Sequence, residues 1–219
     1  MSHQTLIAPA PLKVLSGGFR WVNGRQRNSL LFFDIGNKQY SSAIDKNRLV
    51  PLGEWVPNLP VGSIVGLSAV GGLEKGPSPR IFSWKGPPVA ASICYELSNG
   101  KAISKAVLDG AEWILATANL DPYPMALQRQ FLSLAQLRSI ENSREIITVS
   151  NNGPSSWINS EGEVKALLPS FEENFGISLL HLKKEKTFYT RFGEIPLICL
   201  LILGMFGYVF ELFKDQKLL

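Results

Sequence analysis

One cysteine in the chain stands where a nucleophile could work. Cys94 lies in the stretch Val89 to Glu96 (VAASICYE), where small and apolar residues lead into a cysteine, a tyrosine and a carboxylate. An apolar run closed by turn residues, with a helical pattern through Leu108, predicts a buried strand that ends at Cys94. N–H groups of the following helix would favour a thiolate and a developing oxyanion. A lone cysteine after such a strand is more often a small buried hydrophobe, so the rest of the chain must decide.

A cysteine acyl-transfer site also needs a base, a cation or donor that faces the oxyanion, and groups that orient them. The only histidines, His3 and His181, lie at polar ends of the domain, which makes a Cys–His pair improbable. The base is therefore expected to be a carboxylate and the cation a lysine. Lys46, which follows Asp45 in a segment without helical or strand periodicity, is the best lysine candidate. Taken alone, such an Asp-Lys pair is usually part of a solvated loop.

Composition limits the class of protein and the kinds of partner. The 219-residue chain is long enough for one sizeable domain, and its 45% hydrophobic content exceeds that of an ordinary soluble domain. The net charge of +4 comes without a basic block or an aromatic stripe, which argues against nucleic acid. The start shows no signal peptide pattern. Cys94 and Cys199 are expected to be distant free thiols, and nothing indicates a metal site or cofactor.

The elements that would position these residues alternate strand, helix and strand, which predicts a layered α/β architecture. Pro124 to Glu141 has apolar residues at helical spacing and is expected to be an amphipathic helix. Residues 16 to 27 and 58 to 80 are expected to be irregular. The expected strands are Asn28 to Asp34 paired with Gln39 to Ile44 around Gly36-Asn37, Ile81 to Trp84, Val89 to Cys94, Ala111 to Ala118, Ile146 to Val149, and a hairpin of Ser155 to Ile158 with Val164 to Leu168.

The C-terminal part is the most apolar stretch of the chain. Ile195 to Phe210 carry no charge, and aromatic residues near the ends of this run suit anchoring at a membrane interface. The run is slightly shorter than the roughly 20 apolar residues of a full span. We predict a catalytic domain at residues 1–190 and a transmembrane helix with a short tail at residues 191–219. A buried core helix is the alternative.

Several sequence blocks together resemble a known family. Asp45 to Pro57 (DKNRLVPLGEWVP), followed by Ile93 to Glu96 (ICYE), resembles the nitrilase (carbon–nitrogen hydrolase) superfamily and, within it, the apolipoprotein N-acyltransferase family. Arg138 to Glu141, Ser150 to Ser155, and Thr187 to Gly193 before the apolar run match further blocks of that family in the same order. The resemblance covers nearly the whole chain and favours a catalytic Cys94.

The resemblance implies a nitrilase-like α-β-β-α layered sandwich and assigns roles to particular residues. Cys94 would be the nucleophile, and Lys46 would help to hold the oxyanion. Glu54 and Glu96 would be supporting carboxylates, and Tyr95 would line the site beside the nucleophile.

The resemblance also implies an activity and a place in the cell. A fatty acyl chain would pass from a phospholipid to the cysteine as a thioester, and then to the N-terminal amine of a diacylglyceryl-cysteine lipoprotein. No cofactor or metal is involved. The implied location is the bacterial inner membrane, with the catalytic domain on the extracytoplasmic side.

Two features differ from the family pattern. The family's general-base glutamate lies in an earlier strand, whereas Asp34 is the only acidic residue before Asp45 here. We therefore expect an incomplete sandwich without its first strands, in which turnover is impaired because a base commonly contributes about 10²- to 10⁴-fold. The missing N-terminal portion would come from the same gene or from another chain. Ala118 to Tyr123 (ANLDPY) also differs from the family in a loop that lines the site.

Two alternatives remain from the sequence. One is a nitrilase-type amidase that hydrolyses small amides, which the same Cys–Lys–Glu chemistry would permit. The other is an inactive, membrane-tethered remnant that acts as a binding or scaffold piece.

Overall fold

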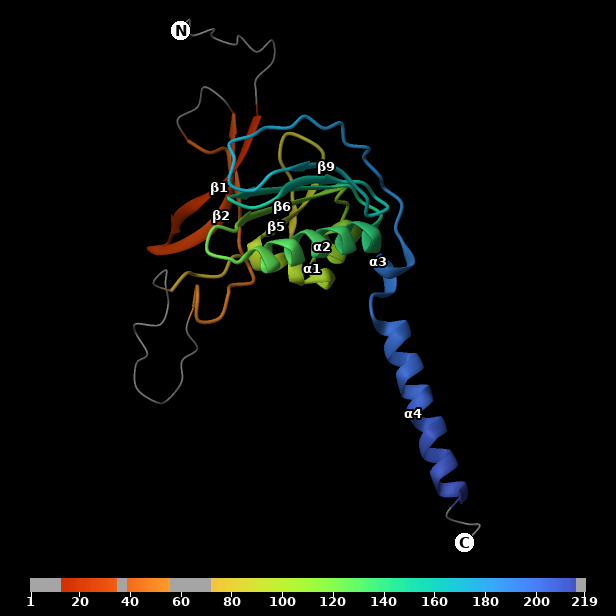
Figure 1. The fold of residues 1–219 in the computed structure, drawn as a ribbon. Coiled ribbons are helices and arrows are strands. Elements are labelled where there is room, and N and C mark those ends of the chain that lie inside the picture. The colour runs from red at the N-terminus through yellow and green to blue at the C-terminus, as the bar shows by residue number, and fades with distance from the viewer. Residues whose placement is uncertain (1–12, 35–38, 56–71, 216–219) are drawn as a thin grey trace, which may run out of the picture.

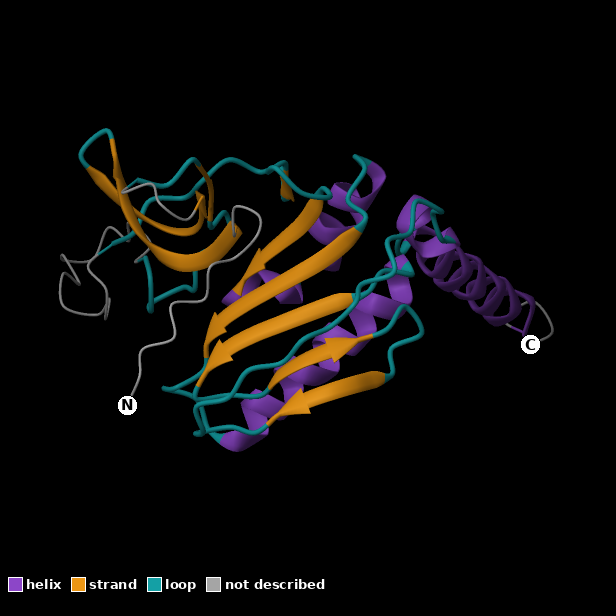
Figure 2. Cartoon of the chain, turned by 90° about the horizontal axis from the view of Figure 1, so that it is seen from above, coloured by secondary structure: helices purple, strands orange, loops and turns teal. Residues whose placement is uncertain are grey.

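The computed structural model describes residues 13–34, 39–55 and 72–215. Within these ranges the chain forms a small β-sheet, a larger β-sheet, and a layer of two helices (Figures 1 and 2). A further apolar helix, α4, projects away from these layers. The expected Gly36-Asn37 turn and the first part of the irregular segment expected at residues 58–80 lie outside the described residues.

The small sheet consists of three antiparallel strands in the order β1-β2-β3, with β1 at Lys13–Val22, β2 at Arg25–Asp34 and β3 at Ser42–Asp45. The expected pairing of β2 with β3 is confirmed. The expectation of an irregular loop at residues 16–27 is wrong, because β1 and β2 form a hairpin there. Its tight turn places Asn23 and Gly24 at φ values of 51° and 76°, as a two-residue Asn-Gly turn requires.

The large sheet has the strand order β4-β5-β6-β7-β8-β9. Its central strands β5 (Val89–Ile93), β6 (Trp113–Asn119) and β7 (Ile146–Asn151) are parallel. Helices α1 (Gly100–Leu108) and α2 (Met125–Asn142) make the two crossovers, which confirms the predicted strand, helix and strand order. The antiparallel outer strands are β4 (Ile81–Phe82), β8 (Ser155–Ile158) and β9 (Val164–Leu168).

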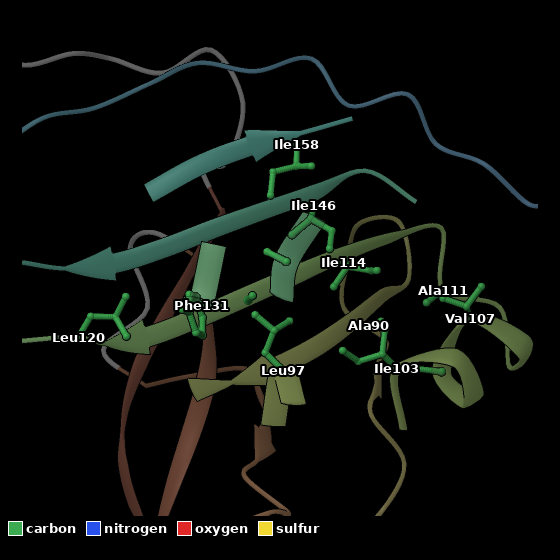
Figure 3. Close-up of a cluster of buried hydrophobic side chains, with 13 residues drawn as sticks. Ala90, Leu97, Ile103, Val107, Ala111, Ile114, Leu120, Phe131, Ile146 and Ile158 are labelled. Carbon is green, nitrogen blue, oxygen red and sulfur yellow. The ribbon is translucent and has the colours of Figure 1, made fainter. Parts of the chain in front are cut away.

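Strands β5 and β6 of the large sheet are buried on both faces. On one face, strand residues such as Ala90 and Ile114 pack against Leu97, Ile103 and Phe131 from the helical side (Figure 3). On the other face, the small sheet contributes a second core together with β5 and β6. This second core contains Leu30, Phe32, Ile44, Val89, Ala91, Ile93, Trp113 and Leu115. Burial on both sides explains why β5 has no polar alternation in its sequence.

Helix α2 is present as predicted, but only part of its expected apolar face is buried. Phe131 and Ala135 pack in the core, whereas Leu127, Leu137 and Ile140 are exposed. The buried face also includes Gln128 and Ser139, whose side chains donate hydrogen bonds to loop and turn carbonyls. Buried polar side chains are stable where loop backbone groups need partners, so hydrophobic spacing alone does not define the whole buried face.

The C-terminal part contains the short helix α3 (Phe188–Phe192) and the helix α4 (Ile195–Asp215). The apolar side chains of α4 between Ile195 and Tyr208 are exposed. The predicted transmembrane helix is not supported, since no helix in the described part of the chain combines the length and apolarity needed to cross a membrane.

Candidate active site

A cavity of about 940 Å³ lies between the two sheets and contains the candidate catalytic residues. Its polar side includes Cys94, Lys46 and Glu54. Apolar residues from both sheets form much of the remaining wall, among them Leu15, Phe19, Ile93, Trp113, Leu115, Ile147 and Val149. The cavity therefore places a few reactive side chains beside a largely apolar wall.

Cys94 occupies the predicted turn at the end of β5. It opens a five-residue 3₁₀ helix, Cys94–Ser98, which separates the strand from α1. Its φ of 55° is in the left-handed region. For a residue other than glycine this conformation costs about 1–3 kcal/mol, and such strain concentrates at functional sites. A sharp strand-to-helix turn of this kind exposes a nucleophile at the end of a sheet.

The environment of the Cys94 thiol contains opposing influences. Burial raises the pKa of Cys94, and the nearby carboxylates of Glu54 and Glu96 also raise it. The Lys46 ammonium group and a hydrogen bond with the Tyr95 backbone act in the opposite direction. Because the net pKa shift is upward, a base must remove the thiol proton for Cys94 to attack efficiently.

Lys46 follows directly after β3 and is almost fully buried, with 1% of its surface exposed. Its Nζ lies 2.7 Å from Glu54 Oε1 in a buried ion pair. The other oxygen of Glu54 accepts a hydrogen bond of 2.8 Å from the Val50 backbone N–H, and Asn28 Nδ2 lies 3.4 Å from Glu54 Oε1. These contacts hold the ammonium group at the wall of the cavity that Cys94 also lines.

Glu96 is buried behind the nucleophile turn rather than in the cavity. Its Oε1 accepts hydrogen bonds from the backbone N–H groups of Asn47 and Arg48, at 2.6 and 3.1 Å. Its Oε2 accepts from the Ile93 backbone N–H at 2.9 Å. This carboxylate therefore joins the segment after Lys46 to the residue before Cys94.

The structure places the backbone of Tyr95 beside the Cys94 thiol but its side chain outside the cavity. Its side chain is 38% exposed, is not among the residues that line the cavity, and lies beneath the Arg48 guanidinium at 4.7 Å from the ring centroid. Its backbone is what reaches the thiol. The resemblance implied a tyrosine ring that lines the site, whereas the turn after Cys94 leaves the ring outside the cavity lining.

Other residues complete the site. The loop predicted to line it does so through Ala118, Asn119, Pro122 and Tyr123. Among the described residues, Glu54 is the single carboxylate at the cavity wall, while Asp34 pairs with Lys85 at 2.8 Å. The sequence did not point to Asn28, because its side chain meets Glu54, which lies 26 residues further along the chain. Within the described ranges, no group of three or more His, Cys, Asp and Glu side chains is arranged to hold a metal ion.

Comparison with known proteins agrees with this geometry. The carbon-nitrogen hydrolase family model matches residues 12–187. The apolipoprotein N-acyltransferase of Prochlorococcus marinus (strain MIT 9313) is 55% identical over 92% of this chain and 40% of its own length. The protein of the same name from a second strain of Prochlorococcus marinus is 56% identical over 91% of this chain and 40% of its own length. The chain thus spans about two fifths of these curated relatives.

A solved structure supports the fold independently. The carbon-nitrogen hydrolase from Helicobacter pylori G27 superimposes with a TM-score of 0.57 at 14% sequence identity, covering 74% of this chain and 60% of that one. The nitrilase-like α/β fold is therefore confirmed, as is the resemblance to apolipoprotein N-acyltransferases. Of the implied α-β-β-α layers, the described residues form one helix layer and the two sheets. From the layered sheets, the family match and the shared sequence blocks, we conclude that this chain belongs to the carbon-nitrogen hydrolase family.

Proposed function

We propose that this chain carries the nucleophile half of a lipoprotein N-acyltransferase site, in which Cys94 accepts a fatty acyl chain from a phospholipid. The observation that carries the proposal is that Cys94 lines the same largely apolar cavity as the Lys46–Glu54 ion pair. The high identity to relatives named apolipoprotein N-acyltransferase supports this activity over hydrolysis of small amides.

The proposed reaction has two acyl-transfer steps. In the first, Cys94 Sγ attacks the ester carbonyl of the phospholipid, the thioester forms, and the lysophospholipid leaves as an alcohol with the proton from the thiol. In the second, the N-terminal amine of the diacylglyceryl lipoprotein attacks the thioester carbonyl. The C–S bond breaks, an amide forms, and the proton lost by the amine converts the released Cys94 thiolate back to the thiol. Both steps develop negative charge on the same carbonyl oxygen, which the Lys46 ammonium group and the Tyr95 backbone N–H would stabilise.

The supporting residues have distinct roles in this proposal. Glu54 fixes the Lys46 ammonium group by the 2.7 Å ion pair. Glu96 fixes the backbone on both sides of the site. The base that takes the thiol proton is proposed to come from a portion of protein beyond this chain, in the same polypeptide or in another. We also propose that the enzyme acts at the bacterial inner membrane, with this domain on the extracytoplasmic side, where both lipid substrates are accessible.

Detection of the acyl-enzyme would test this function. The full chain, supplied with the upstream portion of a full-length relative, is incubated with phosphatidylethanolamine vesicles, and its cysteine peptides are analysed by mass spectrometry. We expect one fatty acyl group on Cys94 that neutral hydroxylamine removes, since thioesters react with it. Cys94→Ala should abolish the modification.

Cys199→Ala is the matched control, because Cys199 is an exposed cysteine on α4 outside the cavity. This variant should keep the acyl group on Cys94. Acylation of Cys199 instead of Cys94, or an unmodified Cys94 when an upstream portion of a full-length relative is also supplied, would refute the proposed function and favour an inactive remnant.

A further inference from the structure

Arg80 is a buried arginine that the proposed chemistry does not use. It lies immediately before β4 and is 3% exposed. Burial lowers the pKa of Arg80, and the carboxylates of Glu96 and Asp45 oppose this shift. Removing a guanidinium group from water is costly unless its donors are paired, so the partners of Arg80 indicate why the residue is kept there.

Each side of the guanidinium group contacts a different segment of the chain. Nη1 donates to the carbonyl of Asp45, the residue before Lys46, at 2.6 Å. Nε donates to the Ala91 carbonyl in β5 at 3.2 Å, three residues before Cys94. Nη2 donates to Glu96 Oε2 at 2.7 Å, two residues after Cys94. Arg80 thus connects the end of β3, directly before Lys46, with the residues on both sides of Cys94.

Glu96 extends the same bridge. One of its oxygens accepts from the N–H groups that follow Lys46, and the other accepts from both Arg80 and the Ile93 N–H. The Ala91 N–H in turn donates to the Arg80 carbonyl at 2.8 Å. A lysine side chain has one compact ammonium group and cannot direct donors to three separated acceptors as the planar guanidinium does.

We propose that Arg80 is a positioning residue that sets the Lys46 ammonium group relative to the Cys94 thiol through its contacts with Asp45, Ala91 and Glu96. The inference rests on the proposed function and adds a residue to it. Arg80 does not touch the cavity and acts only through the backbone segments that carry the reactive groups. Its effect should therefore depend on the presence of Lys46.

The test uses the pH dependence of Cys94 alkylation by iodoacetamide in the full chain with Cys199→Ser, so that a single cysteine reacts. Lys46→Met should raise the apparent pKa of Cys94, because the ammonium group lowers it. Arg80→Lys keeps the charge but loses the three-way contact. We expect it to slow alkylation near neutral pH about tenfold, the effect of one unit in the thiol pKa. Adding Arg80→Lys to Lys46→Met should change the rate no further.

Arg144→Lys is the matched control. Arg144 is also buried, at 1% exposed, and donates to the carbonyls of Ala111, Asn142 and Ser143 away from the cavity. It should leave the alkylation profile unchanged even if the thermal unfolding midpoint falls. If Arg80→Lys does not fold, Arg80→Gln supplies the same test, because a single amide group cannot donate to all three acceptors, and it should shift the profile in the same direction as Arg80→Lys.

The outcomes separate the two proposals. An unchanged profile in Lys46→Met would overturn the proposed function. A shifted profile in Lys46→Met with an unchanged one in Arg80→Lys would overturn only the role of Arg80. Equal shifts in Arg80→Lys and Arg144→Lys, or a further shift when Arg80→Lys is added to Lys46→Met, would also overturn it, since both indicate general loosening of the fold.

Discussion

Two features of Cys94 are unfavourable. Its backbone is in the left-handed conformation, and burial raises the pKa of its thiol, which disfavours the reactive thiolate. Neither helps the folded domain. Both are acceptable if the turn must present the sulfur to the cavity and keep water from an acyl intermediate. Lys46 shows the same pattern, because among the residues that the structure describes its buried ammonium group has one anionic partner, Glu54. At the residue scale, the strained turn at Cys94 and the buried charge of Lys46 both lower the stability of the fold at the site of the proposed reaction.

Asp45 provides a stabilising counterpart beside Lys46. Its carboxylate is 1% exposed and accepts two hydrogen bonds from Arg20, one from Arg27 and one from Ser29. Burial by itself would raise the pKa of Asp45, but these hydrogen bonds outweigh it and lower the pKa from 3.8 to about 2. Because the folded pKa is depressed, the stabilisation is complete above the unfolded value and is lost as the pH falls from about 4 to about 2.

We therefore predict that Asp45→Asn removes part of the acid sensitivity of the protein. The free energy of unfolding of the native chain should fall by about 2 kcal/mol more between pH 5 and pH 2 than that of the variant. Urea unfolding at a series of pH values measures the difference. Arg20→Met should move the loss to higher pH, since it removes two of the hydrogen bonds. Parallel acid curves for the native chain and Asp45→Asn would contradict the prediction.

At the element scale, the strongest hydrophobic patterns predicted the correct elements. The apolar run of β5 could be predicted because burial on both faces leaves a continuous hydrophobic signal. The crossovers through α1 and α2 could be predicted because apolar residues recur in them at helical spacing. The β1–β2 hairpin could not, since β1 is largely exposed and contains Gly17-Gly18, which hide the alternation. The Asn23-Gly24 dipeptide was the available signal for its turn.

The sequence likewise predicted some residues of the candidate site and not others. Cys94, Lys46 and Glu54 could be placed together because their sequence blocks carry the family resemblance, and the cavity brings them together. Arg80 and Asn28 could not, because each acts through contacts between segments distant in sequence. The outward direction of the Tyr95 ring depends on the 3₁₀ turn, which no residue pattern indicates.

The crossing of α1 and α2 depends on one glycine. A Cβ on Gly100 would overlap Arg138 Nη1, which forms an ion pair with Glu141 at 2.8 Å. Arg138 is 7% exposed and has little room to move. Gly100 therefore lets the start of α1 approach the end of α2 closely, directly after the turn that carries Cys94.

Gly100→Ala should destabilise the protein by about 1–3 kcal/mol, the usual cost of overpacking, although alanine is the better helix former. Gly204→Ala in α4 is the matched control, because nothing lies within 4 Å of the added Cβ. It should not lower the free energy of unfolding in urea. A neutral or stabilising Gly100→Ala would show that the two helices can separate without cost.

At the scale of the whole molecule, the layers bury their apolar side chains, whereas helix α4 exposes them. The two sheets and the α1–α2 layer bury their apolar faces against one another, leaving the reactive cavity between the sheets. Between Ile195 and Tyr208, helix α4 presents exposed apolar side chains such as Leu200 and Leu203, both 66% exposed. A contiguous exposed apolar surface of this kind is typical of a site that contacts another apolar phase. The proposed lipid substrates make a membrane the expected phase.

We predict that the full chain binds vesicles of phosphatidylethanolamine and phosphatidylglycerol through α4. Replacing Leu200 and Leu203 together by Asp should abolish co-flotation with the vesicles, because charge on the apolar helix opposes its transfer into lipid. The layers should keep their unfolding midpoint, since neither side chain is buried in them. Ile177→Asp is the matched control, as Ile177 is 92% exposed but lies in the extended segment before α3. It should float like the native chain. If the double variant also floats, then the membrane contact lies on the layers, and the cavity rather than the helix would have to face the lipid.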